Sequence, residues 1–356
     1  MTTKGIVCIG DGGLTSMATA QPEKTRRHWR VLQNALLRST SNGAPAPVDA
    51  TGSTASSIAT EFFPLYPETP VDTAKVQMSS PAQENFMWMA YDLSSTTNKQ
   101  VDRSSKVFVH EKRKDVKRVS IAELLSHKVN EGVDNTGNIR TWPSEQILLS
   151  YMLSSGVCSQ VQRRGAGGDV LPVMCCELGS GMAGLASQGL LACAPVDFER
   201  VVVTDGNPLS VKNLQLCIEE NKIQQVFAAR AQHTDITAEL LRWDRNATLR
   251  EDLQHQFDLV FASDCLFFEE FHEDLAYTIK SLLRRGSGRC LLLQPSRNGS
   301  MERFCVIAER HGFIISQSRD FDPKIVRKHE EYVQTRPDYV PDVHFPVLLT
   351  LTLATS

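Results

Sequence analysis

The residues best suited to chemistry lie in one stretch, between positions 173 and 207. Residues 173–177 (VMCCE) form an apolar run that ends in an acid, and the glycine-rich sequence LGSGMAGL follows directly. This order predicts a buried strand, a tight turn and then a helix. Because Gly179 and Gly181 have no Cβ, the backbone at these two positions can lie directly against a bound ligand.

A second acid is placed to hold a sugar. Residues 201–205 (VVVTD) predict another short strand, and its last residue, Asp205, comes 24 positions after Gly181. In nucleotide-binding folds, a carboxylate at this distance from the glycine turn accepts hydrogen bonds from the two ribose hydroxyls. The pair of strands therefore predicts a site for a ligand that contains adenosine.

The spacing alone leaves two ligands open. The GSGMAG sequence of residues 179–184 fits the dinucleotide pattern G-x-G-x-x-G. Glu177, however, stands two residues before the first glycine, where a carboxylate would repel a pyrophosphate. The same carboxylate suits S-adenosylmethionine, whose amine and sulfonium are both positive. The residues thus favour S-adenosylmethionine over NAD, with a purely structural turn as the third possibility.

A third acid is expected in the same crevice. Residues 257–264 (FDLVFASD) are apolar almost throughout and end at Asp264. In open α/β sheets, ligands bind beyond the carboxyl ends of the strands, so Glu177, Asp205 and Asp264 should converge. Three acids in one crevice suit a cationic cofactor and an amine substrate.

Two tryptophans are candidates for packing against the ligand. Trp142 lies in a polar loop just before a helix that starts at Pro143, and Trp243 stands beside Asp244 where the adenine ring is expected to stack. Each could equally be a core residue.

Alternating apolar strands and helices predict an α/β fold of the Rossmann type. We expect helices at 182–194, 207–221, 269–285 and 299–311, and strands at 226–231, 289–294, 313–321 and 345–353. The segment between the last two strands shows no helix of regular period, so these strands should form an antiparallel hairpin. His272 falls on a charged helix face and is expected to be solvated.

Composition limits the possible partners and compartments. A net charge of −3 with 22% charged residues does not favour nucleic acid. No sequence pattern indicates a membrane segment, because the longest weakly charged span contains Glu177, Pro195 and four glycines. The nine cysteines lack paired metal-ligand spacings and suit a reduced, cytoplasmic protein without a metal site.

The N-terminal region, residues 1–105, is expected to differ from the catalytic domain at 106–356. Residues 24–38 predict a basic amphipathic helix that either packs on the main domain or docks a partner such as calmodulin. Residues 39–60 are rich in Ser, Thr, Ala, Gly and Pro, and should be a disordered linker. The basic residues 112–118 form either a solvated turn or a contact for an acidic partner.

Taken together, the motifs resemble those of the seven-strand protein-lysine methyltransferases. The resemblance runs from about residue 107 to 353 and is carried by residues 142–145 (WPSE), 177–181 (ELGSG), 205–207 (DGN), 241–244 (LRWD) and 264–267 (DCLF). Within that family, the chain is most similar to the branch that methylates calmodulin. The resemblance implies a seven-stranded sheet with an antiparallel last strand and helices on both faces.

The resemblance also implies roles for individual residues. The expected cofactor contacts are Trp142, Glu177, Gly179, Ser180, Gly181, Asp205, Gly206, Asn207, Trp243, Ala262 and Ser263. Asp264 and Phe267 would line the lysine entrance as the catalytic pair. Many members have Tyr where Phe267 stands, so a hydroxyl near the amine is absent here.

The implied activity is methyl transfer from S-adenosylmethionine to a lysine of calmodulin, up to trimethyllysine, by a monomer in the cytoplasm and also the nucleus. Two alternatives are an NAD-dependent Rossmann oxidoreductase, which Glu177 disfavours, and a non-enzymatic calmodulin-binding protein. The second alternative is supported only by the basic helix at 24–38.

Overall fold

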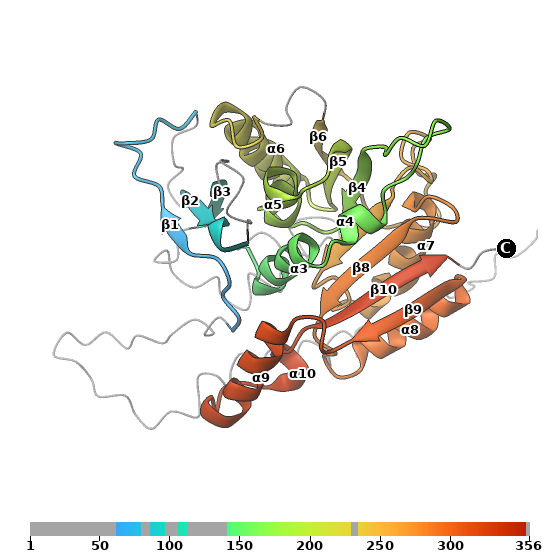
Figure 1. The fold of residues 1–356 in the computed structure, drawn as a ribbon. Helices are drawn as coiled ribbons and strands as arrows, with labels where there is room; N and C mark the ends of the chain where they lie inside the picture. The colour runs from blue at the N-terminus through green and yellow to red at the C-terminus, as the bar shows by residue number, and fades with distance from the viewer. Residues whose placement is uncertain (1–61, 80–85, 97–105, 113–140, 229–233, 354–356) are drawn as a thin grey trace, which may run out of the picture.

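The central feature of the computed structural model is a seven-stranded mixed sheet. The structure describes residues 62–79, 86–96, 106–112, 141–228 and 234–353. The strand order is β6-β5-β4-β7-β8-β10-β9 (Figure 1). The strands are β4 (Val173–Glu177), β5 (Phe198–Asp205), β6 (Asp235–Leu240), β7 (Leu259–Ser263), β8 (Arg289–Gln294), β9 (Phe313–Ser318) and β10 (Val347–Leu353).

The sheet has the predicted mixture of strand directions. β4 pairs in parallel with β5 and β7, β5 with β6, and β7 with β8. β10 lies antiparallel between β8 and β9. The expectation of an antiparallel last strand is confirmed, and the reversal of chain order about β4 makes the ends of β4, β5 and β7 the place for a ligand.

Helices cover both faces of this sheet, which confirms the predicted fold class (Figure 1). One apolar core joins alternate residues of the strands to α3 (Pro143–Ser154), α5 (Leu185–Cys193) and α6 (Pro208–Ile223). The other core joins the remaining strand residues to α7 (His272–Leu282) and α8 (Ser300–Arg310). Strands buried on both faces explain why 173–177 and 259–263 read as continuous apolar runs.

A second, smaller sheet lies at the N-terminal side of the fold. It consists of β1 (Glu68–Pro70), β2 (Phe86–Asp92) and β3 (Lys106–Lys112), all antiparallel. It is fixed to α6 by Asn221, whose amide donates to the carbonyl of Phe108 at 2.7 Å and accepts from its N–H at 2.8 Å. The irregular pattern of residues 61–98 does not predict strands β1 and β2, whereas the apolar run at 107–110 predicts a strand that is confirmed as part of β3.

The expected domain boundary between residues 105 and 106 falls between β2 and β3, which pair along their length. Phe62 and Trp88 belong to the same apolar core as β4 and β5. Residues before and after the expected boundary therefore share one core. The basic helix at 24–38, the linker at 39–60 and residues 113–118 of the basic cluster lie outside the described residues.

Three expectations about elements were wrong. Residues 226–228 form a turn in which Val226 and Phe227 are buried in the apolar core, and β6 begins only at Asp235; residues 229–231 lie outside the described ranges. A helix, α9 (Pro323–Thr335), separates β9 from β10, and Asp322 caps it by accepting from the N–H of Lys324. A short helix, α10 (Pro341–His344), follows it. His272 is buried, not solvated.

The remaining elements are short: the 3₁₀ turns η1 (Ser94–Thr96) and η3 (Glu269–Phe271), and α4 (Val157–Gln160).

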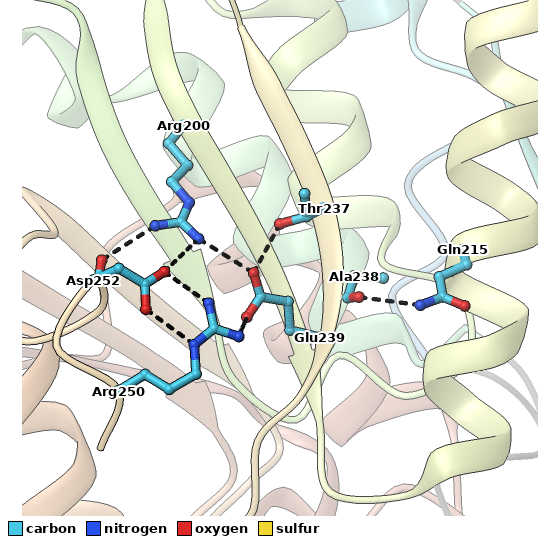
Figure 2. Close-up of polar contacts among 7 residues, drawn as sticks. All are labelled: Arg200, Gln215, Thr237, Ala238, Glu239, Arg250 and Asp252. Atoms are coloured by element: carbon cyan, nitrogen blue, oxygen red, sulfur yellow. Dashed lines mark hydrogen bonds and ion pairs between the residues drawn. The ribbon is translucent and has the colours of Figure 1, made fainter. Parts of the chain in front are cut away.

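The outer strand β6 is held by a network of charges. Arg250 contacts Glu239 at 2.8 Å and Asp252 at 2.7 Å, while Arg200 of β5 contacts the same two acids at 3.3 and 3.1 Å (Figure 2). From α6, the amide of Gln215 reaches the carbonyl of Ala238 on β6 at 3.4 Å. Charges beside an edge strand discourage its pairing with another chain.

Candidate functional site

The glycine turn after β4 has the geometry that its sequence predicts. Gly179, Gly181 and Gly184 have φ of +60°, +62° and +55°, in the left-handed region that favours glycine. A Cβ on Gly179 would lie 2.8 Å from the sulfur of Cys265 and 3.3 Å from the ring of Trp243. The turn is thus tightly covered at Gly179, and only glycine fits there.

Asp205, at the end of β5, ties the glycine turn to the start of α6. One carboxylate oxygen accepts from the N–H of Gly181 at 2.9 Å, and the other accepts from the N–H of Asn207 at 2.8 Å. A carboxylate offers about four lone-pair sites, more than these two bonds use. Asp205 is half-buried, so its carboxylate is fixed in direction and suits the two hydroxyls of a ribose.

Two neighbouring polar residues hold the strand ends together. The hydroxyl of Ser180 donates to the carbonyl of Thr204 at 3.0 Å, and the hydroxyl of Thr204 donates to the carbonyl of Glu177 at 2.7 Å. Asn207 is completely buried and caps α6 by accepting from the N–H of Leu209 at 2.9 Å. In this structure, the side chains of Ser180 and Asn207 therefore shape the site from within the protein.

Glu177 is buried with a second acid beneath the first turn of α5. Its carboxylate accepts from the N–H of Ser187 at 3.1 Å, and that of Glu145 accepts from the N–H of Ala186 at 3.1 Å. Burial raises the pKa of Glu177 to about 7, and burial with the nearby Glu177 raises the pKa of Glu145 well above its usual range. The carboxylate of Glu177 thus faces the helix N-terminus, which favours negative charge.

Most of the other expected cofactor residues surround the same strand ends. Trp142 is partly buried at the position preceding α3, and Trp243 packs on Gly179 from the loop after β6. Gly206 continues directly from Asp205. Ala262 and Ser263 form the end of β7, next to β4. The structure therefore places ten of the predicted cofactor residues on or beside the ends of β4, β5 and β7, while Trp142 stands apart in sequence at the start of α3.

Asp264 ends β7 in an unusual conformation and is paired with an arginine. Its φ is +58°, which is uncommon for a residue other than glycine. The carboxylate binds the guanidinium of Arg297 through two contacts, one of them 2.7 Å between Oδ2 and Nη2. Backbone in sparsely populated regions is often found at functional sites.

The aromatic residues after Asp264 form one wall of this part of the site. The rings of Phe267 and Phe268 pack edge to face with centroids 5.0 Å apart, and the guanidinium of Arg297 lies 5.4 Å from the centroid of Phe267. His272 lies behind this wall, with Nε2 3.1 Å from the carbonyl of Leu266. Burial lowers the pKa of His272, so this imidazole is neutral at pH 7.

Three residues in the site were not predicted from the sequence. Glu145 and Cys265 appeared only within the motifs at 142–145 and 264–267, and Arg297 belonged to no motif. A signal existed for Glu145, because an acid in the first turn of a helix that carries a buried stripe is placed near the sheet. Arg297 lies 33 positions from its partner Asp264, and no local pattern joins them.

The described residues contain neither a cluster of metal ligands nor a membrane-spanning helix. Over residues 62–353, wherever the structure describes them, no cluster of three or more His, Cys, Asp or Glu side chains could hold a metal ion. The eight cysteines of those ranges are all free. None of the described helices is long and apolar enough to cross a membrane.

Comparisons with known proteins agree with the strand order and the motifs. The family model of lysine methyltransferases matches residues 124–311. The calmodulin-lysine N-methyltransferase of Arabidopsis thaliana is 30% identical over 328 residues, which are 91% of this chain and 95% of that protein.

Solved structures of methyltransferases align with this chain at low similarity. The ribosomal protein L11 methylase of Lactobacillus delbrueckii subsp. bulgaricus has a TM-score of 0.33 and 15% identity, over 62% of this chain and 82% of that one. The geranyl diphosphate C-methyltransferase of Streptomyces coelicolor has a TM-score of 0.36 and 11% identity, over 59% of this chain and 84% of that one. These low scores add nothing to the fold assignment, which rests on the strand order.

Proposed function

We propose that this chain, which belongs to the lysine methyltransferase family and uses S-adenosylmethionine as its methyl donor, transfers methyl groups to a lysine side chain of calmodulin. The observation that best supports this substrate is the similarity to a calmodulin-lysine N-methyltransferase, which extends over 91% of the chain. That alignment reaches beyond the part matched by the family model and includes N-terminal sequence.

The residues at the ends of β4 and β5 fit the donor. Asp205 would accept the ribose hydroxyls, since its carboxylate is already directed by the N–H groups of Gly181 and Asn207. Trp243, which packs on Gly179, offers a ring on which adenine can stack. Glu177 lies buried behind the turn, and a positive ligand nearby would favour the ionised form of its carboxylate.

S-adenosylmethionine, when bound, supplies a methyl group already activated by its sulfonium. The protein therefore needs chiefly to position the lysine nitrogen in line with that methyl group. The nitrogen uses its lone pair to form the new bond, so it must arrive deprotonated. The proton that it then carries is released to water between rounds, and a strong general base is not required.

We propose that the substrate lysine binds beside Asp264 and the rings of Phe267 and Phe268. A carboxylate oxygen of Asp264 would accept a hydrogen bond from the amine and so direct its lone pair. The rings of Phe267 and Phe268 favour a methylated ammonium by cation–π contact, worth on the order of 0.5–2 kcal/mol. Such contacts persist as methyl groups are added, which is consistent with products up to trimethyllysine.

An acidic protein substrate should be attracted to positive surface. The basic cluster that starts at Lys112 and the basic helix expected at 24–38 are the candidates in the sequence. We further propose that the chain acts as a monomer in the cytoplasm, and also in the nucleus.

The test is methyl transfer to purified calmodulin. The wild-type protein, incubated with labelled S-adenosylmethionine and calmodulin, should label calmodulin, and peptide mass spectrometry should place one to three methyl groups on a lysine. Asp205→Asn should weaken donor binding in calorimetry. Asp235→Asn, at an exposed acid that begins β6 and so lies at the opposite end of that strand, is the matched control and should bind donor normally.

Two results would exclude the proposal. Donor binding without label on calmodulin, together with label on another protein of a cell extract, would give this methyltransferase a different substrate. Calmodulin binding with no label on any protein would favour a non-enzymatic role.

A further inference from the structure

The strongest unexplained contact in the site is the ion pair between Asp264 and Arg297. The two side chains are only 15% and 17% exposed, and two parallel contacts join them. Bidentate pairing between a carboxylate and a guanidinium fixes both groups in one plane. The carboxylate that is proposed to meet the lysine therefore already has a cationic partner within the chain.

The loop that carries Arg297 is built to present it. The N–H of Arg297 donates to the carbonyl of Asp342 at 2.8 Å, and the N–H of Asn298 donates to the Asp342 carboxylate at 2.7 Å. Arg297, Asn298 and Gly299 all have positive φ, at +49°, +59° and +76°. Two residues other than glycine in this region are strained, and the contacts to Asp342 hold them there.

Several titratable groups surround this ion pair, and the charges of Asp205 and Glu177 act, like that of Asp264, on the neighbouring Cys265. His344 on α10 is neutral at pH 7, because burial and the charge of Arg297 lower its pKa to about 4. His272 on α7 is also neutral, since burial lowers its pKa. Arg303 on α8 contacts Glu269 of η3, so these two charges compensate each other.

Asp342, on α10, is the charged group that holds this loop from the other side. Its carboxylate accepts from the backbone of Asn298, on the side of the loop that faces α10. The net charge next to the amine therefore depends on whether Arg297 compensates the charge of Asp264.

A carboxylate without a partner would bind a lysine as its ammonium form, because an opposite charge within a few ångströms raises the pKa of an amine. The ammonium form has no lone pair and cannot accept a methyl group. A carboxylate whose charge is compensated can still accept a hydrogen bond, but it stabilises the ammonium much less. The neutral amine is then available at lower pH.

We propose that Arg297 is a positioning residue that compensates the charge of Asp264 and fixes its plane, so that the site receives the substrate lysine as a neutral amine. This inference rests on the proposed function and extends it to a residue outside the expected motifs. The Arg297 side chain can be changed while the backbone contacts to Asp342 are retained, which separates its charge from the structure of the loop.

The experiment is a pH–rate profile for calmodulin methylation at saturating donor. Arg297→Met removes the charge, and the rising limb of kcat, which reports the amine in the enzyme–substrate complex, should shift to higher pH by about one unit or more. Arg297→Lys keeps the charge but loses the planar fork, so the limb should stay in place while kcat falls. Arg245→Met, which removes a half-exposed arginine near Asp274, is the control and should change neither quantity.

Donor binding by calorimetry and urea unfolding should be measured for each variant, and Arg297→Gln provides a second neutral variant if Arg297→Met does not fold. An unshifted limb in a folded, donor-binding neutral variant would overturn the inference. A lower KM for calmodulin with an unshifted limb would instead make Arg297 a competitor of the substrate lysine. Failure of the wild type to methylate calmodulin at any pH would remove the proposed function, and the inference with it.

Discussion

Substitution of Gly179 by alanine tests how tightly the glycine turn is packed. Two costs add up in the variant. A left-handed φ of +60° disfavours alanine by about 1–2 kcal/mol. The new Cβ would also lie 2.8 Å from the Cys265 sulfur and 3.3 Å from Trp243, and overpacking of this kind costs about 1–3 kcal/mol. The free energy of unfolding should therefore fall by about 2–5 kcal/mol.

Gly286 provides a matched control for the backbone cost alone. Its φ is +76°, and nothing lies within 4 Å of a Cβ placed there. Gly286→Ala should therefore cost only about 1–2 kcal/mol. Urea unfolding of both variants, followed by circular dichroism, measures the difference.

Removing the sulfur that blocks the new Cβ should recover the packing cost. Cys265→Ala in the background of Gly179→Ala relieves the closest contact but not the strained φ. A double-mutant cycle with the two single variants then isolates the clash, and its coupling energy should be favourable by about 1–3 kcal/mol. If Gly179→Ala costs no more than Gly286→Ala, or if the coupling energy is near zero, the turn is not packed as described.

Three further outcomes are expected. Burial holds the pKa of Glu177 at about 7 against an ordinary 4.5, so the folded protein keeps a proton that the unfolded chain releases, and stability should fall as pH rises through this window. Glu177→Gln should flatten that dependence in urea unfolding at pH 5 and 8; the same slope in both proteins would contradict it. Asp264→Ala should lower kcat far more than donor affinity in calorimetry, and equal activity would remove Asp264 from the mechanism. Charge reversal at Lys112, Arg113 and Lys114 should slow calmodulin methylation at low salt, with the difference lost at high salt; an unchanged rate would leave this cluster as solvated surface.

The strands around the ligand were predictable because their signals are local. Apolar runs that end in Glu177, Asp205 and Asp264 contain both the strand and its end, and three close glycines mark the turn. Strand β8 was predicted with its observed limits at 289–294. A strand that is buried on both faces is apolar along its whole length, so its sequence predicts it clearly.

The errors have physical causes that a single sequence does not display. β6 contains Glu239, whose charge is satisfied by Arg200 and Arg250, so a mixed sequence forms the outer strand, while residues 226–228 form a turn. The helix α9 is mostly exposed, and Ile325 is its one buried residue. Because most of its positions are polar or charged, the sequence did not predict it as a helix that packs on the sheet. Arg297 could not be found because its role depends on a distant partner.

The earliest described residues pack on the latest helices. Phe62 lies edge to face against Tyr332 of α9 and Tyr339, with centroids 5.3 and 4.9 Å apart, and 4.5 Å from the ring of His344. During synthesis, these partners leave the ribosome last, so Phe62 stays uncovered until nearly the whole chain has emerged. Closing such a long loop late slows folding. Newly made protein should therefore pass through a stage with an exposed aromatic end, at which a chaperone can bind.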